Sequence, residues 1–307
     1  MQFGEHLAKV VAASVPCCVG IDPHVDQMQI VVAGPYTEVN LVMWGWGVIG
    51  AIHKAGIRVV KPQSALFEQF GPAGMKALVQ IISYARSKGM VVILDAKRGD
   101  IGSTARGYVK AAYEAMGANS VTLNPYLGPE SLEPFQKYIL DRKGLQMNGA
   151  GGPGAWVLVR TSNPGAAAWQ CGDQNQSPVS RSVANWINRA NSDVYTHEQQ
   201  LSFERDNGEL DELPLGNFGA VIGATLDAKE MAGWREYMPN TWFLLPGYGA
   251  QGASAADCLH GFRRDKTGGL IVAARSVLFS KEEHPVDWRD GVYERAKAFA
   301  DDVRGVL

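Results

Sequence analysis

Short aliphatic runs recur along the chain, and segments with helical patterns lie between most of them. Eight runs of four or five residues are apolar enough to form buried strands, at 17–21, 57–60, 91–94, 120–123, 156–159, 220–223, 242–245 and 270–273. Helical segments include 74–88, 103–116, 180–190 and 228–237, with Gly or Pro near many of their boundaries. Continuous apolar strands that alternate with helices predict a parallel sheet covered on both faces.

The number of repeats decides between an open doubly wound sheet and a closed barrel. Eight β-α repeats favour a (β/α)8 TIM barrel of the α/β class. No G-x-G-x-x-G follows the first strand, where a dinucleotide-binding sheet needs its tight phosphate turn. The length of 307 residues fits one barrel, so we predict a single domain over 1–307. Glycine-rich 141–154 and acidic 201–216 are predicted to be surface-loop insertions without a catalytic part.

Composition and charge narrow the class of protein. Hydrophobic residues make up 46% of the chain and charged residues 20%, as in an ordinary globular protein. The formal net charge is −2 and no basic block is present, so nucleic acid is not an expected partner. Residues 1–14 have the pattern of an amphipathic helix rather than a signal peptide, and the longest apolar run, 41–52, is too short to span a bilayer. Four cysteines without C-x-x-C spacing fit a reducing compartment, so we expect a cytoplasmic protein with no membrane anchor.

Polar side chains follow the predicted strands, at the end where barrels of this kind hold their active sites. They are Asp22, Lys61, Asp95 with Lys97, Asn124, 161–163, Thr225, the glycine-rich loop 246–252 and Arg275. Turn chemistry would account for Asp22 or Asn124, and a surface ion pair for Arg275. Turns do not require Lys61 or Lys97, however, and convergence at equivalent positions of eight repeats indicates one active site.

The loop 246–252 and Arg275 follow the seventh and eighth strands, where barrels commonly bind a phosphate. The backbone N–H groups of a glycine-rich loop and a guanidinium both suit a dianion. A simple tight turn would also explain the glycines, although Gln251 within the loop can hydrogen-bond a ligand. We therefore expect a phosphorylated substrate.

The third strand ends in a run of charge. Asp95 and Lys97 lie two residues apart and so point to the same side of a strand, while Asp100 falls where the next helix begins. With Lys61 they form an alternating set of charges, and neither H-E-x-x-H nor a Cys/His cluster offers a metal site. Opposite neighbours keep Lys97 protonated, so it can stabilise a developing carbanion and then deliver the proton. This chemistry suits a decarboxylation without metal or cofactor, in which Asp95 would disfavour the substrate carboxylate in the ground state.

Strings of residues spread over nearly the whole chain carry a family resemblance. In order they are V-K-P-Q with Lys61, D-A-K-R-G-D-I-G-S-T from Asp95, T-L-N-P-Y-L-G, R-T-S-N-P-G, I-G-A-T and P-G-Y-G-A-Q-G. With these strings the chain resembles the orotidine 5′-phosphate decarboxylase family, whose signature is D-x-K-x-x-D. The resemblance implies decarboxylation of orotidine 5′-monophosphate to uridine 5′-monophosphate and CO2, the last step of de novo pyrimidine synthesis.

The resemblance also implies a role for each matching residue. Lys97 would protonate C6 of the pyrimidine after CO2 leaves. Asp22 and Lys61 would hold the ribose hydroxyls of the substrate. Ser162 would contact its pyrimidine, and Gln251 and Arg275 would hold its phosphate.

A homodimer is a further implication, because the family places its sites at a subunit interface. Asp100 and Thr104 would then serve the neighbouring subunit's site. One departure from the family pattern is Ala274, where many relatives have glycine before the phosphate-binding arginine. It puts only a close approach to the phosphate in doubt, because the backbone N–H is retained.

Three other interpretations stay open at this point. A sugar-phosphate decarboxylase or aldolase of the same barrel group shares D-x-K-x-x-D, but it has an acidic residue after the second strand, where this chain has Lys61. A class I aldolase would form a Schiff base on Lys97, which the flanking Asp95 and Asp100 oppose because they keep the amine charged. A catalytically silent nucleotide-phosphate sensor would have a broken charge set, whereas here all four charges are present.

Overall fold

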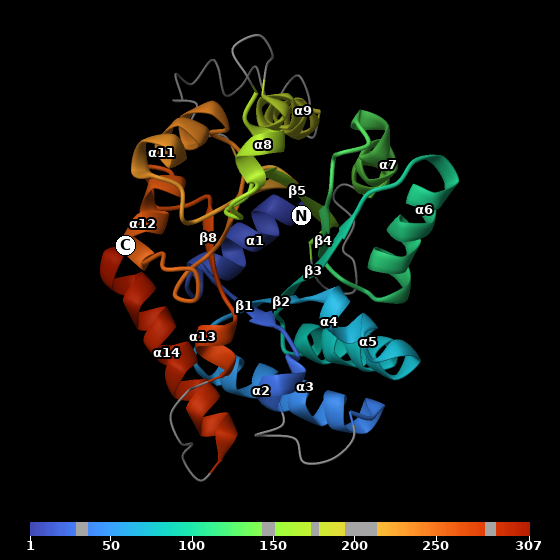
Figure 1. Cartoon of the computed structure of the whole chain (residues 1–307), viewed down its shortest axis with the longest axis vertical. Helices are drawn as coiled ribbons and strands as arrows, with labels where there is room; N and C mark the ends of the chain where they lie inside the picture. Colours follow the sequence, from blue (N-terminus) through green and yellow to red (C-terminus); the bar gives the residue numbers. More distant parts are fainter. Residues whose placement is uncertain (29–35, 143–150, 173–177, 194–213, 280–286) are drawn as a thin grey trace.

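The computed structural model describes residues 1–28, 36–142, 151–172, 178–193, 214–279 and 287–307, and its strands form one closed barrel (Figure 1). All strands are parallel and pair in chain order, and the last pairs with the first. Each predicted run overlaps one of them, so the predicted (β/α)8 barrel is confirmed. The strands are β1 (Cys17–Ile21), β2 (Val59–Pro62), β3 (Val91–Arg98), β4 (Ser120–Leu123), β5 (Gly154–Arg160), β6 (Phe218–Ile222), β7 (Phe243–Pro246) and β8 (Gly269–Ala273).

Helices surround the barrel, and no helix in the described part of the chain is long and apolar enough to cross a membrane. The predicted helix 228–237 is found unchanged, whereas predicted 103–116 divides into an α-helix and a π-helical turn, η1 (Ala111–Ala115). Short 3₁₀ turns lie at η2 (Pro129–Ser131) and η4 (Leu259–Gly261). The α-helices are α1 (Phe3–Ala12), α2 (Val25–Met28), α3 (Glu38–Lys54), α4 (Ser64–Glu68), α5 (Gly71–Ser87), α6 (Gly102–Lys110), α7 (Glu133–Asp141), α8 (Ala166–Gln170), α9 (Val179–Ser192), α11 (Ala228–Tyr237), α12 (Ala255–Cys258), α13 (Arg275–Leu278) and α14 (Trp288–Val306).

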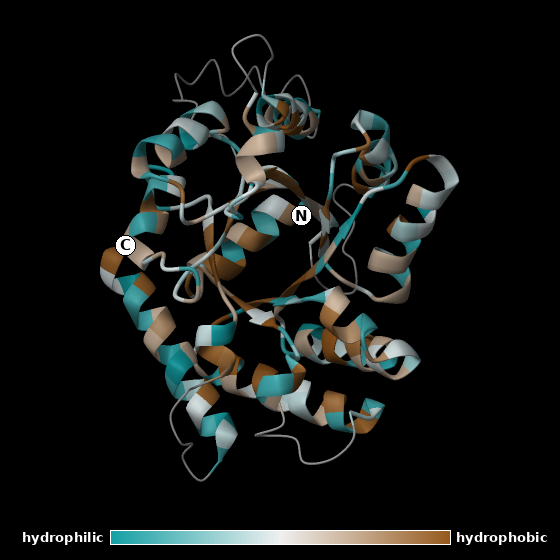
Figure 2. Cartoon of the chain, in the orientation of Figure 1, coloured by the Kyte–Doolittle hydropathy of each residue, from teal (hydrophilic) through white to brown (hydrophobic). Residues whose placement is uncertain are grey.

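Strand alternation sorts the apolar side chains into an outer and an inner core. On β3, Val92 and Leu94 belong to the cluster that packs against the helices, while Val91 and Ile93 belong to a second cluster with α1. Successive side chains on a strand point to opposite faces, so the second cluster fills the interior of the barrel. Figure 2 shows the strands largely brown and the helices alternating brown and teal, as expected for helices with one face on the barrel. Inward-facing positions at the open end are therefore the ones that reach a ligand.

Helix α1 closes the other end of the barrel. Phe3 packs edge-on against Trp156 of β5 at a ring-centroid distance of 6.2 Å, and Trp242, just before β7, donates to the carbonyl of Gly4 at 3.3 Å. These contacts lie at the N-terminal ends of the strands. In the described part of the chain, α1 thus covers the interior on this side, and the cavity lies at the C-terminal ends of the strands.

The two predicted surface insertions are corrected where the structure describes them. Most of 141–154 and of 201–216 lies outside the described residues. Their C-terminal ends, 151–154 and 215–216, are buried rather than solvated. Gly154 begins β5, and a Cβ there would lie 2.1 Å from the ring of Phe3. These ends pack beneath the barrel against α1, a nonlocal contact that a loop-like composition does not reveal. The single domain over 1–307 stays a prediction.

Candidate active site

A cavity of about 600 Å³ opens at the C-terminal ends of the strands. Strand alternation explains which side chains reach it: Val59 and Ile93 face the interior, so Lys61 and Asp95, two positions further along β2 and β3, face it too. The same rule carries Asp22 inward, four positions beyond Cys18. The residues proposed from sequence that line the cavity are Asp22, Lys61, Asp95, Lys97, Asn124, Thr161, Ser162, Asn163, Gln251 and Arg275. Thr225 is not among the residues that line it.

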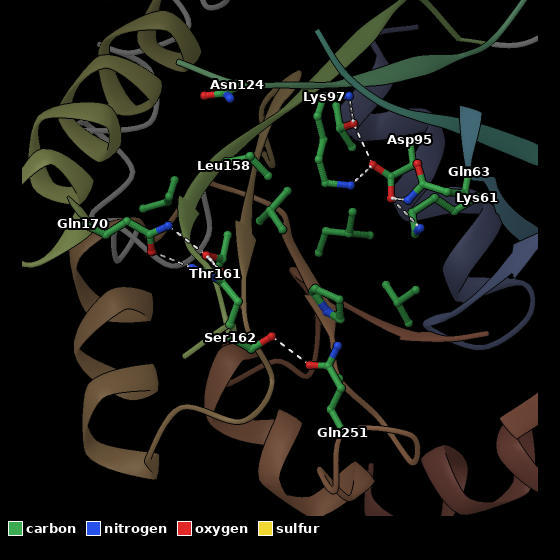
Figure 3. Close-up of a pocket in the computed structure, with 18 of the residues that line it drawn as sticks. Lys61, Gln63, Asp95, Lys97, Asn124, Leu158, Thr161, Ser162, Gln170 and Gln251 are labelled. Atoms are coloured by element: carbon green, nitrogen blue, oxygen red, sulfur yellow. Dashed lines mark hydrogen bonds and ion pairs between the residues drawn. The ribbon is translucent and has the colours of Figure 1, made fainter. Parts of the chain in front are cut away.

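Asp95 is the centre of the charged part of the cavity (Figure 3). Its Oδ2 accepts from Lys61 Nζ at 2.7 Å and from Gln63 Nε2 at 3.1 Å, and its Oδ1 accepts from Lys97 Nζ at 2.6 Å and from Thr122 Oγ1 at 2.9 Å. Two donors on each oxygen occupy the lone pairs of the carboxylate. Asp95 and Lys61 are buried, at 5% and 7% exposure. The group is therefore a fixed constellation of two cations around one anion.

The electrostatics of this group keep all three charges in place. Burial alone would raise the pKa of Asp95, but the charges of Lys61 and Lys97 and their hydrogen bonds outweigh burial, so the pKa lies well below the ordinary value of 3.8. Burial lowers the pKa of Lys61, and the carboxylates of Asp95 and Asp22 more than reverse this, so its pKa lies above the ordinary value of 10.5. At neutral pH Lys61 is therefore an ammonium group and Asp95 a carboxylate.

Asp22 has a buried oxygen that is free to accept a hydrogen bond. Its Oδ1 is buried and has no partner within the described residues. Burial raises the pKa of this carboxyl, and the nearby charge of Lys61 opposes the rise. A buried polar atom left unpaired is costly, so this oxygen is suited to a ligand that brings a donor, such as a hydroxyl group.

The loop after β7 forms another wall of the cavity. Gly247, Gly249 and Gly252 have positive φ angles of 132°, 68° and 92°, which side chains rarely adopt. Ser162 Oγ donates to Gln251 Oε1 at 2.8 Å and so joins the loop after β5 to this one (Figure 3). The glycine-rich loop predicted from the sequence thus lies at the rim of the cavity, with Gly249 and Gly252 exposed.

Arg275 stands on the neighbouring wall, at the start of α13. Its side chain is exposed, and Ala274 before it also lines the cavity. A Cβ at Gly20 would lie 2.7 Å from the Cβ of Ala274, so the methyl group of Ala274 fills space that the glycine leaves. The departure at Ala274 is therefore accommodated by close packing against β1.

Asp100 and Thr104 do not line the cavity of their own chain. Asp100 Oδ1 accepts from the neighbouring Ile101 N–H at 2.8 Å, and Thr104 is exposed on α6. The expectation that Asp100 flanks Lys97 within one chain is therefore corrected: the chain brings together Lys61, Asp95 and Lys97, and Asp100 points elsewhere.

The sequence-based set left out several cavity residues, among them Gln63, Thr122, Trp169 and Gln170. Gln63 and Thr122 bind Asp95, while Gln170 holds Thr161 with two hydrogen bonds, from Thr161 N–H at 2.9 Å and to Thr161 Oγ1 at 2.8 Å. Trp169 is an exposed aromatic side chain on the rim. Gln63 continues the inward alternation of β2, a signal that was present in the sequence. Gln170 and Trp169 lie on α8, and nothing local indicates that they turn toward the cavity.

The arrangement defines a class of protein before any comparison is made. It is a (β/α)8 barrel in which the buried ion pair of Lys61 and Asp95, joined by the half-exposed Lys97, lies beside a rim formed by a glycine-rich loop and Arg275. Within the described residues no group of three His, Cys, Asp or Glu side chains could hold a metal ion.

Comparison with known proteins gives the family. The model of the orotidine 5′-phosphate decarboxylase / HUMPS family matches residues 47–286. Orotidine 5′-phosphate decarboxylase of Rhodopirellula baltica is 34% identical over 320 residues, covering 95% of each chain, and that of Salinispora arenicola is 36% identical over 282 residues, covering 90% of each. The structure of Leishmania donovani OMP decarboxylase is 28% identical, covers 100% of this chain and 99% of its own, and has a TM-score of 0.74. The chain belongs to the orotidine 5′-phosphate decarboxylase family.

Proposed function

We propose that this chain decarboxylates orotidine 5′-monophosphate to uridine 5′-monophosphate and CO2, the last step of pyrimidine nucleotide synthesis. The observation that carries the proposal is the constellation of Lys61, Asp95 and Lys97 at the open end of a barrel of this family. A sugar-phosphate enzyme of the same barrel group would need an acidic residue where Lys61 stands, and the buried ion pair of Lys61 with Asp95 leaves no place for one.

Lys97 is the proposed proton donor. The bond between C6 and the carboxylate carbon breaks, the electron pair stays on C6, and CO2 leaves. The ammonium group of Lys97 stabilises the developing negative charge and then transfers a proton to C6. Its side chain is 46% exposed, so solvent can return the proton between turnovers. This route requires neither a metal nor a cofactor.

Asp95 has two proposed effects. It holds both ammonium groups in place before the substrate arrives, which is electrostatic preorganisation. Its charge, kept by a strongly lowered pKa, also faces the substrate carboxylate and disfavours it relative to the transition state, from which that charge departs as CO2.

The remaining cavity residues are proposed to bind the other parts of the nucleotide. The unpaired oxygen of Asp22 and the ammonium of Lys61 suit the ribose hydroxyls, and Ser162 suits the pyrimidine. Gln251 and Arg275 lie on the rim formed by the loops after β7 and β8, where a phosphate would also meet glycine N–H groups.

A homodimer is proposed as the active assembly. Asp100 and Thr104 lie outside their own cavity, which fits a role in the site of a second subunit. Ile101, next to Asp100 in the chain, is a large apolar side chain that is 54% exposed, as expected if a second subunit covers it. The proposed compartment is the cytoplasm, since all four cysteines are free thiols.

The test is the ultraviolet absorbance change of orotidine 5′-monophosphate on addition of purified, metal-stripped protein. We expect conversion to uridine 5′-monophosphate. If no conversion occurs, even with magnesium restored, the proposal is overturned in favour of a related sugar-phosphate enzyme, or of a silent binder if uridine 5′-monophosphate still binds.

A further inference from the structure

Strand β3 contains a β-bulge at its charged C-terminal end. Leu94 pairs with Val121 of β4 and Arg98 pairs with Leu123, so four steps along β3 correspond to two along β4. Extra residues in one strand of a pair lose their ladder partners and re-aim the chain. Here the bulged residues include Ala96 and Lys97, and Lys97 adopts a φ of 46°, in the left-handed region that lysine rarely enters.

Thr122 takes the place of the missing ladder partner. Its Oγ1 accepts from the backbone N–H of Ala96 at 3.0 Å and of Lys97 at 2.9 Å, and it donates to Asp95 Oδ1 at 2.9 Å. A hydroxyl has two lone pairs and one proton, and all three are used here. Both N–H groups can only donate, so the hydroxyl proton must lie toward Asp95. Thr122 is 1% exposed, and water therefore has no ready access to replace it.

We propose that Thr122 is the positioning residue of the reaction: its hydroxyl holds Lys97 in the left-handed backbone conformation and orients the Asp95 carboxylate toward the Lys97 ammonium group. With its proton and both lone pairs used within the protein, the hydroxyl has no hydrogen bond left for a substrate. It acts through two residues at once, because the backbone that carries Lys97 and the carboxylate that binds Lys97 Nζ at 2.6 Å share this one partner. The role of Thr122 rests on the proposed decarboxylation.

The kinetic test compares three variants. Thr122→Val keeps the size and branching of the side chain but removes every hydrogen bond, and we expect kcat to fall by about a hundredfold, as for a misplaced catalytic group. KM for orotidine 5′-monophosphate stays close to that of the unchanged protein, because the phosphate rim lies on other loops. Thr122→Ser restores the hydroxyl and most of kcat.

The matched control is Thr241→Val. Thr241 is also fully buried, and its Oγ1 accepts from Asn191 Nδ2 at 3.3 Å, but it precedes β7 at the closed end of the barrel. We expect its kcat to stay unchanged. An unaltered kcat in Thr122→Val overturns the proposal. Loss of kcat in Thr122→Ser as large as in Thr122→Val also overturns it, since packing rather than the hydroxyl would then matter.

Hydrogen exchange separates this inference from the proposed reaction. We expect the amides of Ala96 and Lys97 to exchange faster in Thr122→Val than in the unchanged protein or in Thr241→Val. If the unchanged protein does not decarboxylate orotidine 5′-monophosphate, the proposed function is wrong. The exchange rates still show whether the Thr122 hydroxyl holds the amides of Ala96 and Lys97. Equal protection of both amides in Thr122→Val and the unchanged protein overturns the positioning role whether or not the enzyme is active.

Discussion

Replacing Asp95 by Asn tests whether this carboxylate is the counter-charge of a buried cation. At 2.7 Å from Lys61 Nζ, the attraction is about 6 kcal/mol for an effective dielectric constant of about 20. Desolvation offsets part of this, and removing one partner of a buried pair costs about 3–5 kcal/mol net. Asp95→Asn should therefore lower the free energy of unfolding by about 3–5 kcal/mol. A domain of typical stability would stay folded but would be only marginally stable.

The pH dependence of the loss has a definite sign. The lowered pKa of Asp95 gives stability that is present above pH 3.8 and lost as pH falls through the folded-state pKa, while the raised pKa of Lys61 gives stability that is present below pH 10.5 and lost above it. Between these limits the contribution in the unchanged protein is constant. In Asp95→Asn, Asp22 is the carboxylate left to oppose burial, the largest single influence on Lys61. We therefore expect the pKa of Lys61 to fall below its ordinary value, so that the unfolded state binds more protons than the folded state. The stability of the variant should then rise with pH.

Urea unfolding followed by tryptophan fluorescence measures both effects, because Trp156 and Trp242 are fully buried. Curves at about pH 6 and about pH 9 give the free energy of unfolding from the linear dependence on denaturant. The control is Asp141→Asn, which removes a pair with Lys137 of similar length, 2.9 Å, but 52% exposed at the carboxylate, and should cost no more than about 0.5 kcal/mol.

Two results would refute the reasoning about Asp95. One is a loss no larger than that of Asp141→Asn, and the other is a variant whose stability does not change with pH. A double variant, Lys61→Met with Asp95→Asn, adds a further check: it removes the uncompensated ammonium group, so it should recover part of the stability lost in Asp95→Asn alone. If the double variant is less stable than the single one, Lys61 is not the group left unpaired.

Three further predictions concern activity. Lys97→Ala should abolish turnover, because a positioned acid contributes about 10²–10⁴-fold, yet uridine 5′-monophosphate should still bind by calorimetry; substantial residual turnover would exclude the donor role. Equal mixing of inactive Lys97→Ala and Asp100→Ala subunits should restore about one quarter of the activity, since half of the dimers are mixed and each has one intact site; no recovery in verified mixed dimers would remove Asp100 from the partner's site. Gly247→Ala should raise KM by about tenfold through strain at a φ of 132°, whereas Gly233→Ala, with open space on α11, should leave KM unchanged; equal KM values would contradict a role for the loop conformation.

Local pattern was enough to predict the barrel and the edge at which its cavity lies. Apolar runs separated by helical segments identify strands, and residues two apart on a strand share a face, so Lys61 and Asp95 could be placed together without coordinates. The rule does not extend to Asp100, which lies beyond the bulge and the end of β3, where the chain no longer alternates. It also could not show that 151–154 and 215–216 are buried, because their partner is α1, far away in the sequence.

The position of Thr122 could be predicted from the sequence, but its role could not. In the run 120–123, Val121 and Leu123 face the helices, so Ser120 and Thr122 face the interior, and a polar inward residue at the open end of a strand is a detectable candidate. What the sequence does not contain is the register of β3 against β4, because that register is set by pairing between residues 25 to 27 positions apart. Only that pairing leaves the N–H groups of Ala96 and Lys97 without ladder acceptors and places one hydroxyl where both can reach it. Local alternation is thus enough to predict that Thr122 faces the interior, whereas its role in orienting Lys97 depends on how β3 pairs with β4 in the closed barrel.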